Sequence, residues 1–241
     1  MKRRIKTFGK LVYLALTGGA SRTRFPIHGV TVDIPADVDT RIRFFIARNR
    51  YENTEAALIR QHVASGETVI ELGGALGVIS KVIRDQIGPE GTHVVVEPNP
   101  AIFDICTKNA GGGERTHMRR AAIGYGVDEV VLQQDASLLD NRVVEGAAAG
   151  ANSFSVPTTS LKELHQLVGG RFTLICDIEG MEGDLVAQDA ETFAHCDKII
   201  MEVHPQFLEQ RGTSLETMIG QLAAMGFKQV SLEKWALYMT R

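Results

Sequence analysis

The sequence TVIELGGALGVIS, residues 68–80, carries the strongest structural signal in this chain. It begins as a short run rich in β-branched residues, and after three glycines the segment Val78 to Ile87 has apolar residues at helical spacing. We interpret it as a strand, a tight turn and the N-terminus of a helix. Glycine allows positive φ angles and lets a ligand approach the backbone closely. The first N–H groups of the helix are free to face that ligand.

A second acidic residue follows the glycines at a spacing that is typical of nucleotide-binding folds. Glu97 ends the apolar run Thr92 to Val96, and Pro98-Asn99-Pro100 prevents that run from continuing. An acid that binds ribose hydroxyls is expected about 20 residues after the glycines of a nucleotide-binding turn. The two features together predict a cofactor that contains a nucleoside.

The chemistry of the turn indicates which cofactor. A dinucleotide fingerprint needs G-x-G-x-x-G, whereas the glycines here are Gly73, Gly74 and Gly77. Glu71 also directs a negative charge at the turn, which disfavours a pyrophosphate and favours a cation such as a sulfonium. The pattern resembles that of S-adenosylmethionine-dependent methyltransferases of the Rossmann-like class. A strand–helix turn without any ligand is the alternative.

Composition limits the remaining possibilities. The chain has 241 residues, of which 44% are hydrophobic, enough for one α/β domain with a sizeable core. A net charge of -3 implies no general attraction to nucleic acid. The three cysteines, with no C-x-x-C pair, predict neither disulfides nor a zinc site and fit the reducing cytoplasm. No apolar run approaches the roughly 18 residues that span a membrane.

Residues 1–52 are expected to form an N-terminal extension. A basic start followed by Leu11 to Leu16 mimics a secretory signal, but residues 17–22 offer no clear cleavage site. We expect an amphipathic helix that packs on the fold, contacts a second copy in a homo-oligomer, or, less favoured, lies peripherally on an anionic membrane. Arg24 to Pro35 predicts a hairpin that turns at His28-Gly29, and Asp37 to Asn49 predicts a helix.

Residues 53–241 alternate strand and helix patterns, which predicts a mostly parallel sheet with helices on both faces. A terminal pair of strands, Lys228 to Leu232 and Ala236 to Thr240, would insert one antiparallel strand. Arg115 to Ile123 is predicted as one strand, and Asp128 to Gln134 as part of an inserted hairpin. The small-residue-rich stretch from Asp135 to Asn152 is predicted as a loop, either an active-site lid or a tolerated insertion.

Ionisable residues follow two later strands. Asp177 and Glu179 come after the buried run Phe172 to Cys176, and Glu202 and His204 end the next apolar run. Residues two apart share one face of an extended strand, and ligands bind at the carboxyl ends of strands in open parallel sheets. Carboxylates and a histidine near a cofactor suit proton removal from a hydroxyl or amine.

Simpler interpretations of these residues remain open. Glu182 and Asp184 begin a predicted helix, where acids interact favourably with the dipole. His204 could be a surface histidine, and Glu202 could hold a loop backbone. The carboxylates could also bind a divalent cation, although our main interpretation includes no metal.

The motifs of the chain resemble those of the FkbM-type S-adenosylmethionine-dependent methyltransferases. The first family motif runs D-V-G-A-N-x-G, and residues 71–77 are ELGGALG. The second runs E-P-x-P, and residues 97–100 are EPNP; the third and most specific runs K-x-D-V-E-G-x-E, and residues 175–182 are ICDIEGME. The segment from Val156 to Leu164 is similar to one that usually ends T-L-D-x-L. The resemblance covers about Thr54 to Met239.

The chain departs from the family at three positions. Ala75 replaces the asparagine of the first motif, Glu71 replaces its aspartate, and Lys162 replaces the aspartate of T-L-D. The missing asparagine removes one expected cofactor contact but does not affect the expected fold.

The resemblance implies a Rossmann-like sheet of seven strands, one of them antiparallel, and methyl transfer to an oxygen of a sugar, glycan or small natural product. The amino-acid tail of the cofactor would contact the glycine turn, and Asp177 would be the base, with Glu179 and His204 positioning the acceptor. The expected cofactor-binding residues are Glu71, Gly73, Gly74, Gly77, Glu97, Pro98, Ala122, Ile123 and Asp177. The alternatives are a nicotinamide-dependent oxidoreductase and a non-catalytic module that only binds the cofactor.

Overall fold

The computed structural model describes residues 10, 14, 21–134, 141–144 and 153–241. The predicted N-terminal amphipathic helix therefore lies almost wholly outside the described residues. Within these ranges, no helix has both the length and the apolar character that crossing a membrane requires.

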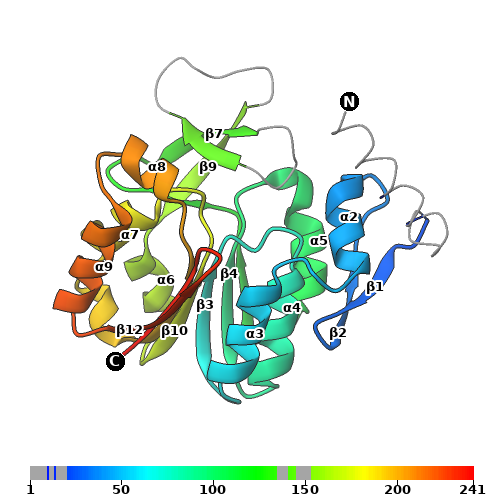
Figure 1. Ribbon diagram of the computed structural model, residues 1–241, viewed down its shortest axis with the longest axis horizontal. Coiled ribbons are helices and arrows are strands. Elements are labelled where there is room, and N and C mark those ends of the chain that lie inside the picture. Colours follow the sequence, from blue (N-terminus) through cyan, green and yellow to red (C-terminus); the bar gives the residue numbers. More distant parts are fainter. Residues whose placement is uncertain (1–9, 11–13, 15–20, 135–140, 145–152) are drawn as a thin grey trace.

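A seven-stranded sheet forms the centre of the molecule, with the strand order β12-β13-β11-β10-β3-β4-β5 (Figure 1). Only β13 runs antiparallel to its neighbours within this sheet. This is the predicted Rossmann-like arrangement, and the terminal pair of strands supplies the antiparallel member as expected. The strands are β3 (Thr68–Leu72), β4 (Thr92–Val96), β5 (Thr116–Arg119), β10 (Phe172–Cys176), β11 (Cys196–Glu202), β12 (Lys228–Glu233) and β13 (Ala236–Thr240).

Apolar side chains on both faces hold the sheet between two layers of helices. Along β3, Val69 belongs to one buried cluster, and Ile70 and Leu72 belong to the other. Such alternation is expected for a strand that is covered on both faces. Helices α6, α7 and α9 pack against one face, and α3, α4 and α5 against the other (Figure 1).

The helices begin and end where local signals place them. Ser160 and Glu163 form a reciprocal capping box at the start of α6, and Asn99 caps α5 ahead of Pro100. The described helices are α2 (Thr40–Ala47), α3 (Asn53–His62), α4 (Val78–Ile87), α5 (Pro100–Ala110), α6 (Leu161–Val168), α7 (Glu182–Gln188), the 3-10 helix η1 (Thr192–His195), α8 (Pro205–Gln210) and α9 (Leu215–Ala224).

The N-terminal hairpin forms as predicted, with β1 (Arg24–Ile27) paired to β2 (Val30–Asp33). Phe25 and Val32 are fully buried and belong to the same apolar cluster as residues of α3 and α4. Asn109 of α5 ties the hairpin down, since its side chain exchanges hydrogen bonds with the backbone of Asp33. The extension therefore packs onto the helix layer beside β3 and β4.

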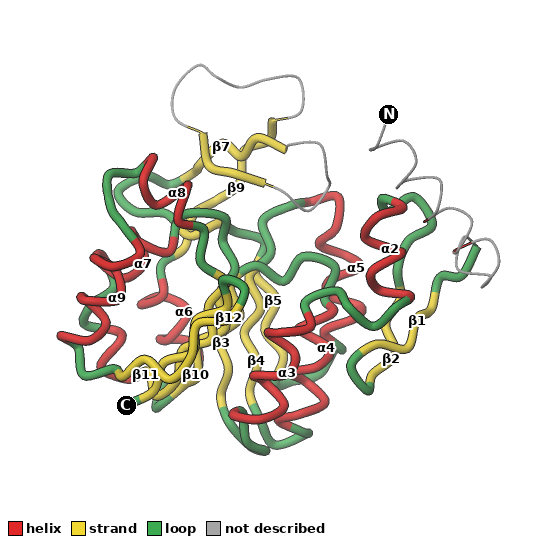
Figure 2. The backbone as a smooth tube through the Cα atoms, in the orientation of Figure 1, coloured by secondary structure: helices red, strands yellow, loops and turns green. Residues whose placement is uncertain are grey.

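A second, smaller sheet stands above the carboxyl edge of the central one, and it corrects three predictions (Figures 1 and 2). Its strand order is β6-β9-β7-β8. The predicted strand from Arg115 to Ile123 is two strands, since the chain leaves the central sheet after β5 and pairs with β9 through β6. The strands are β6 (Ala122–Ile123), β7 (Glu129–Gln134), β8 (Asn141–Val144) and β9 (Ser153–Thr159).

The other two corrections concern β8 and β9. The stretch from Asp135 to Asn152 was predicted as a loop, but β8 lies inside it and pairs with β7; the rest of that stretch lies outside the described residues. The segment before α6 was not predicted as a strand because Pro157 and several Ser and Thr residues weaken its strand pattern. It becomes β9 by pairing with β7 across residues distant in the sequence.

Candidate functional site

Two neighbouring hollows open at the carboxyl ends of the central strands. The larger encloses about 650 Å³ of empty space, including its open mouth, and the smaller about 360 Å³. Gly73 and Asp177 line both hollows, so the two hollows lie side by side at these residues. The larger hollow is lined by Gly73, Ala75, Val96, Glu97, Pro98, Ala121, Ala122, Ile123, Leu132, Asp177, Ile178, Glu179 and Met181. The smaller is lined by Glu52, Glu55, Glu71, Leu72, Gly73, Ile79, Ile175, Cys176, Asp177, Ile200 and Glu202.

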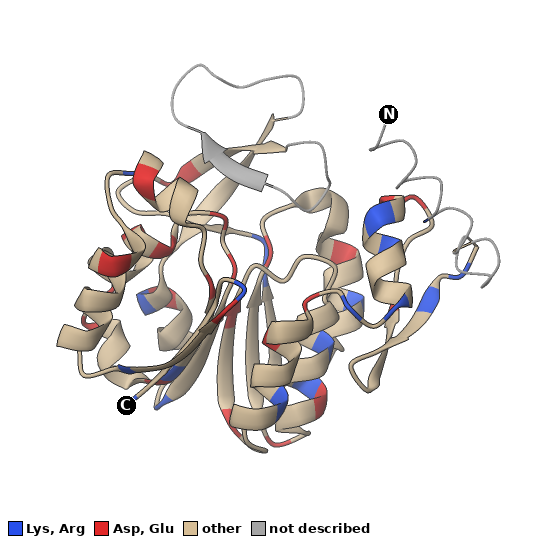
Figure 3. Cartoon of the chain, in the orientation of Figure 1, with Lys and Arg blue, Asp and Glu red and all other residues tan. Residues whose placement is uncertain are grey.

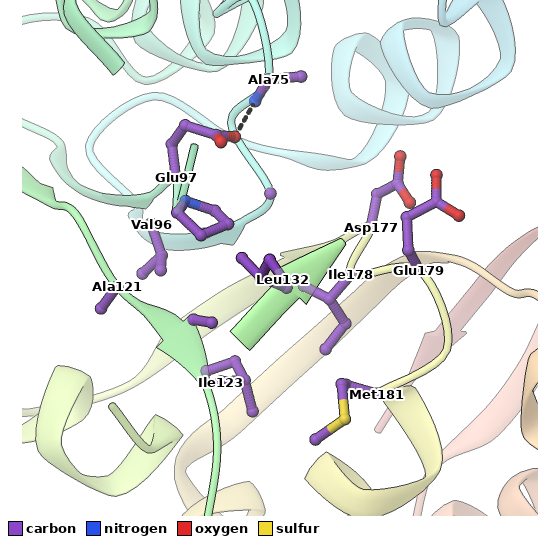
Figure 4. A pocket seen from close by; sticks show the side chains of 13 residues that line it. Ala75, Val96, Glu97, Ala121, Ile123, Leu132, Asp177, Ile178, Glu179 and Met181 are labelled. Atoms are coloured by element: carbon purple, nitrogen blue, oxygen red, sulfur yellow. Dashed lines mark hydrogen bonds between the residues drawn. The ribbon is translucent and has the colours of Figure 1, made fainter. Parts of the chain in front are cut away.

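Glu97 lies on one side of the larger hollow, opposite Asp177 and Glu179, with apolar side chains between them (Figure 4). It follows β4 directly and is 3% exposed. Its Oε2 accepts a hydrogen bond of 2.7 Å from the backbone N–H of Ala75, and its Oε1 accepts one of 2.7 Å from that of Asn99. The carboxylate thus joins the glycine turn to the loop after β4, and each oxygen keeps a lone pair for another donor.

The burial of Glu97 affects its charge. Removal from water raises the pKa of this carboxyl to about 7, although the hydrogen bonds from Asn99 and Ala75 oppose the shift. The nearby Glu71 raises the pKa further. Additional hydrogen-bond donors from a ligand would favour the ionised form, so this group is suited to hydroxyl donors.

Each glycine of the turn is required by packing. A Cβ on Gly73 would lie 1.9 Å from the carbonyl oxygen of Asp177, so this turn presses directly on the end of β10. A Cβ on Gly74 would lie 2.6 Å from Cys106 Sγ, and one on Gly77 would lie 2.8 Å from the Cys106 carbonyl oxygen. Gly74 and Gly77 were predicted to bind the cofactor, but neither lines the two hollows described here; they pack against α5.

Ala75 has an unusual backbone conformation, with φ of 45°. An alanine in the left-handed region costs about 1–2 kcal/mol, and asparagine tolerates this region far better. An asparagine in place of Ala75, as in the motif that residues 71–77 resemble, would therefore lower the backbone cost at this position.

We expect Ala75→Asn to raise the free energy of unfolding by about 0.5 kcal/mol, which corresponds to about 1–2 °C in Tm for a domain of this size. Thermal and urea unfolding measure the change. Ala223→Asn, an exposed position in helix α9, is the matched control and should lower stability by a similar amount. Equal effects at both positions would show that the strain at Ala75 is not relieved by asparagine.

Glu71 lies below the turn and faces the smaller hollow, whereas Glu97 faces the larger. The Ser80 hydroxyl donates to its Oε1 at 3.0 Å, and His93 Nε2 lies 2.9 Å from its Oε2. All three side chains are buried. The two acids predicted around the glycines therefore line different hollows that meet at Gly73.

A group of ionisable side chains gathers between the two strand ends, and we name it the strand-end cluster. Its members are Asp177, Glu179, Glu202 and His204. His204 Nε2 lies 3.8 Å from Asp177 Oδ1, 3.6 Å from Glu179 Oε2 and 3.8 Å from Glu202 Oε1. These distances place the four residues, which follow two neighbouring strands, at one point. Figure 3 shows acidic residues in the loops above the central strands.

Glu182 contacts the histidine of this cluster through its carboxylate. It is wholly buried, and its Oε1 lies 2.9 Å from His204 Nδ1 and accepts the backbone N–H of Gly180 at 3.1 Å. The simpler interpretation, an acid that only interacts with the start of α7, is therefore incomplete. Its neighbour Asp184 pairs instead with Arg211, away from the cluster.

The pKa values of the cluster are strongly shifted. Burial raises the pKa of Asp177 well above its usual range, and the charge of Glu202 raises it further. Burial alone would lower the pKa of His204, but the hydrogen bond with Glu182 and the neighbouring carboxylates outweigh it and raise the pKa to about 9. Shifts of this kind in a hollow are typical of functional sites.

The remaining predicted cofactor-binding residues, Pro98, Ala122 and Ile123, all line the larger hollow. Sequence reasoning missed apolar lining residues such as Leu132 and Met181, which have no chemical signature and are brought in by β7 and α7. It also missed Glu52 and Glu55 at the start of α3, because nothing in the sequence indicates that these two acids face the central sheet.

No protein-family model matches the sequence, and no curated protein matches it. Solved structures with a similar fold include a methyltransferase from Pyrococcus furiosus, with 11% identity and a TM-score of 0.48 over 99% of this chain and 97% of that one. Fibrillarin from Aeropyrum pernix, with natively bound S-adenosyl-L-methionine, has 15% identity and a TM-score of 0.45 over 78% of this chain and 72% of the other.

A third similar structure is magnesium protoporphyrin IX methyltransferase from Synechocystis PCC 6803 with bound S-adenosylhomocysteine. It has 14% identity and a TM-score of 0.45 over 83% of this chain and 84% of the other. These likenesses are distant and concern the fold alone.

Proposed function

We propose that this protein is an S-adenosylmethionine-dependent methyltransferase. The observation that carries the proposal is the buried Glu97 carboxylate, held by the glycine turn and facing a mostly apolar hollow at the carboxyl edge of the sheet. A buried carboxylate with unused lone pairs fits the two hydroxyls of a ribose, and the apolar lining fits a flat base. Such hollows at the carboxyl edge are where ligands bind in open α/β sheets.

The two hollows suit the two halves of this cofactor. Glu97 would hold the ribose, and Ala122 and Ile123 would lie beside the adenine in the larger hollow. The amino-acid tail would lie beside Gly73, which lines both hollows, and extend toward the smaller one. In the smaller hollow, Glu71 would face the ammonium group of the amino-acid tail. When bound, the cofactor supplies a methyl group on a positively charged sulfur.

The protein's own residues would position the acceptor and remove its proton. Asp177 lies at the junction of the hollows, and its raised pKa makes it a stronger base than an ordinary aspartate once ionised. Glu179 and His204 would hold the acceptor against it. Proximity and a placed base are the main contributions that such a site can make to methyl transfer.

An oxygen acceptor on a carbohydrate or a small natural product is our proposal for the substrate. The turn between β12 and β13 supports a carbohydrate. Trp235 in this turn is 56% exposed at a φ of 75°, next to Lys234 at a φ of 48°. Strained, exposed aromatic residues beside a site are often functional. Because Ala236 pairs with Glu202, the turn lies close to the strand-end cluster.

The pH dependence of binding tests the role of Glu97. With a pKa of about 7, the carboxyl is mostly protonated at pH 6 and mostly ionised at pH 8. Ribose hydroxyls donate to the ionised form, so affinity for S-adenosylhomocysteine should rise about tenfold from pH 6 to pH 8 and then level off. Calorimetry at pH 6, 7 and 8 measures this affinity. At pH 6 the carboxyl should release its proton on binding, which appears as a difference in binding enthalpy between two buffers of unequal ionisation enthalpy.

Two results of this titration would count against the proposal. A folded wild type that binds no S-adenosylhomocysteine well above micromolar concentration would end the cofactor assignment. Equal affinity at all three pH values would remove Glu97 from the ribose site. A reduced nicotinamide that binds in its place, seen by enhanced fluorescence, would favour the oxidoreductase alternative.

A further inference from the structure

The strand-end cluster combines three carboxylates and one imidazole at one point. Asp177 and Glu179 follow β10, and Glu202 and His204 end the neighbouring strand β11, so the sheet brings the pairs together. One oxygen each of Asp177 and Glu179 and one ring nitrogen of His204 lie within 4.8 Å of one another. The distances from His204 Nε2 to Glu179 Oε2, 3.6 Å, and to Asp177 Oδ1, 3.8 Å, fit ligand atoms around one ion, which stand about 3–4.4 Å apart at ligand distances of about 2.1–2.2 Å.

Glu182 orients the histidine. Its wholly buried carboxylate contacts His204 Nδ1 at 2.9 Å, which assigns the proton to Nδ1 and leaves the lone pair on Nε2. A carboxylate behind the distal ring nitrogen is the usual support of a metal-binding histidine. Nε2 is then directed at the three carboxylates.

A buried oxygen without a partner is the independent sign of a missing ligand. Asp177 Oδ1 is buried and lacks a hydrogen-bond partner among the described residues, although the whole side chain is 40% exposed. A buried carboxylate oxygen normally has a partner, so its absence at this point of the cluster indicates a group that completes the site.

A protonated His204 that only balances the acids is the alternative. Its Nε2 lies 3.6–3.8 Å from the three carboxylates, whereas a charge-assisted hydrogen bond measures about 2.7–2.9 Å. A proton on Nε2 would therefore form no such bond to them. The three carboxylates also lie around one nitrogen atom, and two positive charges at that point would balance their repulsion more fully than one.

We propose that the strand-end cluster binds one divalent cation through its carboxylates and the Nε2 atom of His204. Carboxylates suit Mg²⁺, Ca²⁺ and Mn²⁺, and imidazole suits transition metals. Mn²⁺ accepts both kinds of ligand and can therefore serve as the probe of this site. The site lies outside any contact proposed for the ribose or adenine.

The cation also limits which acceptor molecules would fit the site; this step rests on the proposed function. An ion held by protein on one side keeps open positions toward the hollow. An acceptor with two neighbouring oxygens, such as a vicinal diol of a sugar, could fill them, and the bound hydroxyl would lose its proton more easily.

Titration of the chelator-treated, folded full chain with MnCl2 tests the site, followed by electron paramagnetic resonance of free Mn²⁺. Methyl donor and acceptor are left out, so the outcome does not depend on methyl transfer. We expect one ion per chain, and at least tenfold weaker binding by His204→Gln, which can still donate to Glu182, and by Asp177→Asn. Glu216→Gln, an exposed acid at the start of α9, should bind like the wild type.

Circular dichroism confirms that each variant is folded. Failure of the folded wild type to bind Mn²⁺ at about 1 mM would overturn the proposal. Protein cation sites built from carboxylates rarely have dissociation constants weaker than about 1 mM. Equal affinity of the wild type, His204→Gln and Asp177→Asn would also overturn it, since the ion would then bind elsewhere.

Discussion

Asp177→Asn should lower kcat by about 10³, within the 10²–10⁴ that a placed base contributes. Asparagine has the same shape but cannot accept the acceptor's proton at neutral pH. Because Asp177 lines both hollows, we expect its loss to have a large effect on the proposed reaction. Formation of S-adenosylhomocysteine at saturating acceptor measures the rate, and calorimetry should give a cofactor Kd within about threefold of the wild type.

Asp184→Asn is the matched control, because Asp184 follows on the same segment but pairs with Arg211 away from the hollows. It should retain wild-type kcat. Asp177→Asn with full turnover and unchanged cofactor affinity would remove the assignment of Asp177 as the base. Rescue of the variant by excess Mn²⁺ would show that Asp177 acts through the ion, which lowers the pKa of a bound hydroxyl, and would remove its assignment as the base.

Glu97→Ala should raise the Kd for S-adenosylhomocysteine about 100-fold, or about 2.7 kcal/mol, as expected for the loss of two hydrogen bonds to a charged group. The carboxylate is buried at the larger hollow and has lone pairs left for two hydroxyls. Calorimetry at pH 8, where the wild-type carboxyl is ionised, gives the clearest comparison.

The substitution also leaves the backbone N–H groups of Ala75 and Asn99 without their acceptor, so stability must be measured alongside affinity. Asn99→Ala is the control for this effect. It removes the cap of α5 in the same loop but does not line the larger hollow. We expect it to lower Tm with little change in Kd. A similar loss of affinity in both variants would mean that Glu97 acts through the loop alone.

The central sheet was predictable because its signals are local. Continuous apolar runs such as Thr92 to Val96, the glycines after Glu71 and the capping residues Ser160 and Asn99 each specify an element from a few neighbouring residues. The antiparallel strand β13 followed from the closing hairpin in the same way. These elements needed no knowledge of distant contacts.

The smaller sheet was not predictable for the opposite reason. β6 has two residues and exists only through its pairing with β9, and β9 contains Pro157 among polar residues. Their partners are distant in the sequence, so no local pattern marks them. Leu132, which this sheet places in the larger hollow, was missed with it.

The candidate site was likewise predictable only in part from the sequence. The residues that end strands, such as Glu97, Asp177 and His204, could be named from the chain alone, since the carboxyl ends of parallel strands meet at one edge. Which hollow each acid faces, the burial that shifts its pKa, and the support of His204 by Glu182 depend on packing between elements. Local sequence specifies the strands and turns, whereas burial and side-chain direction arise only once distant segments have packed together.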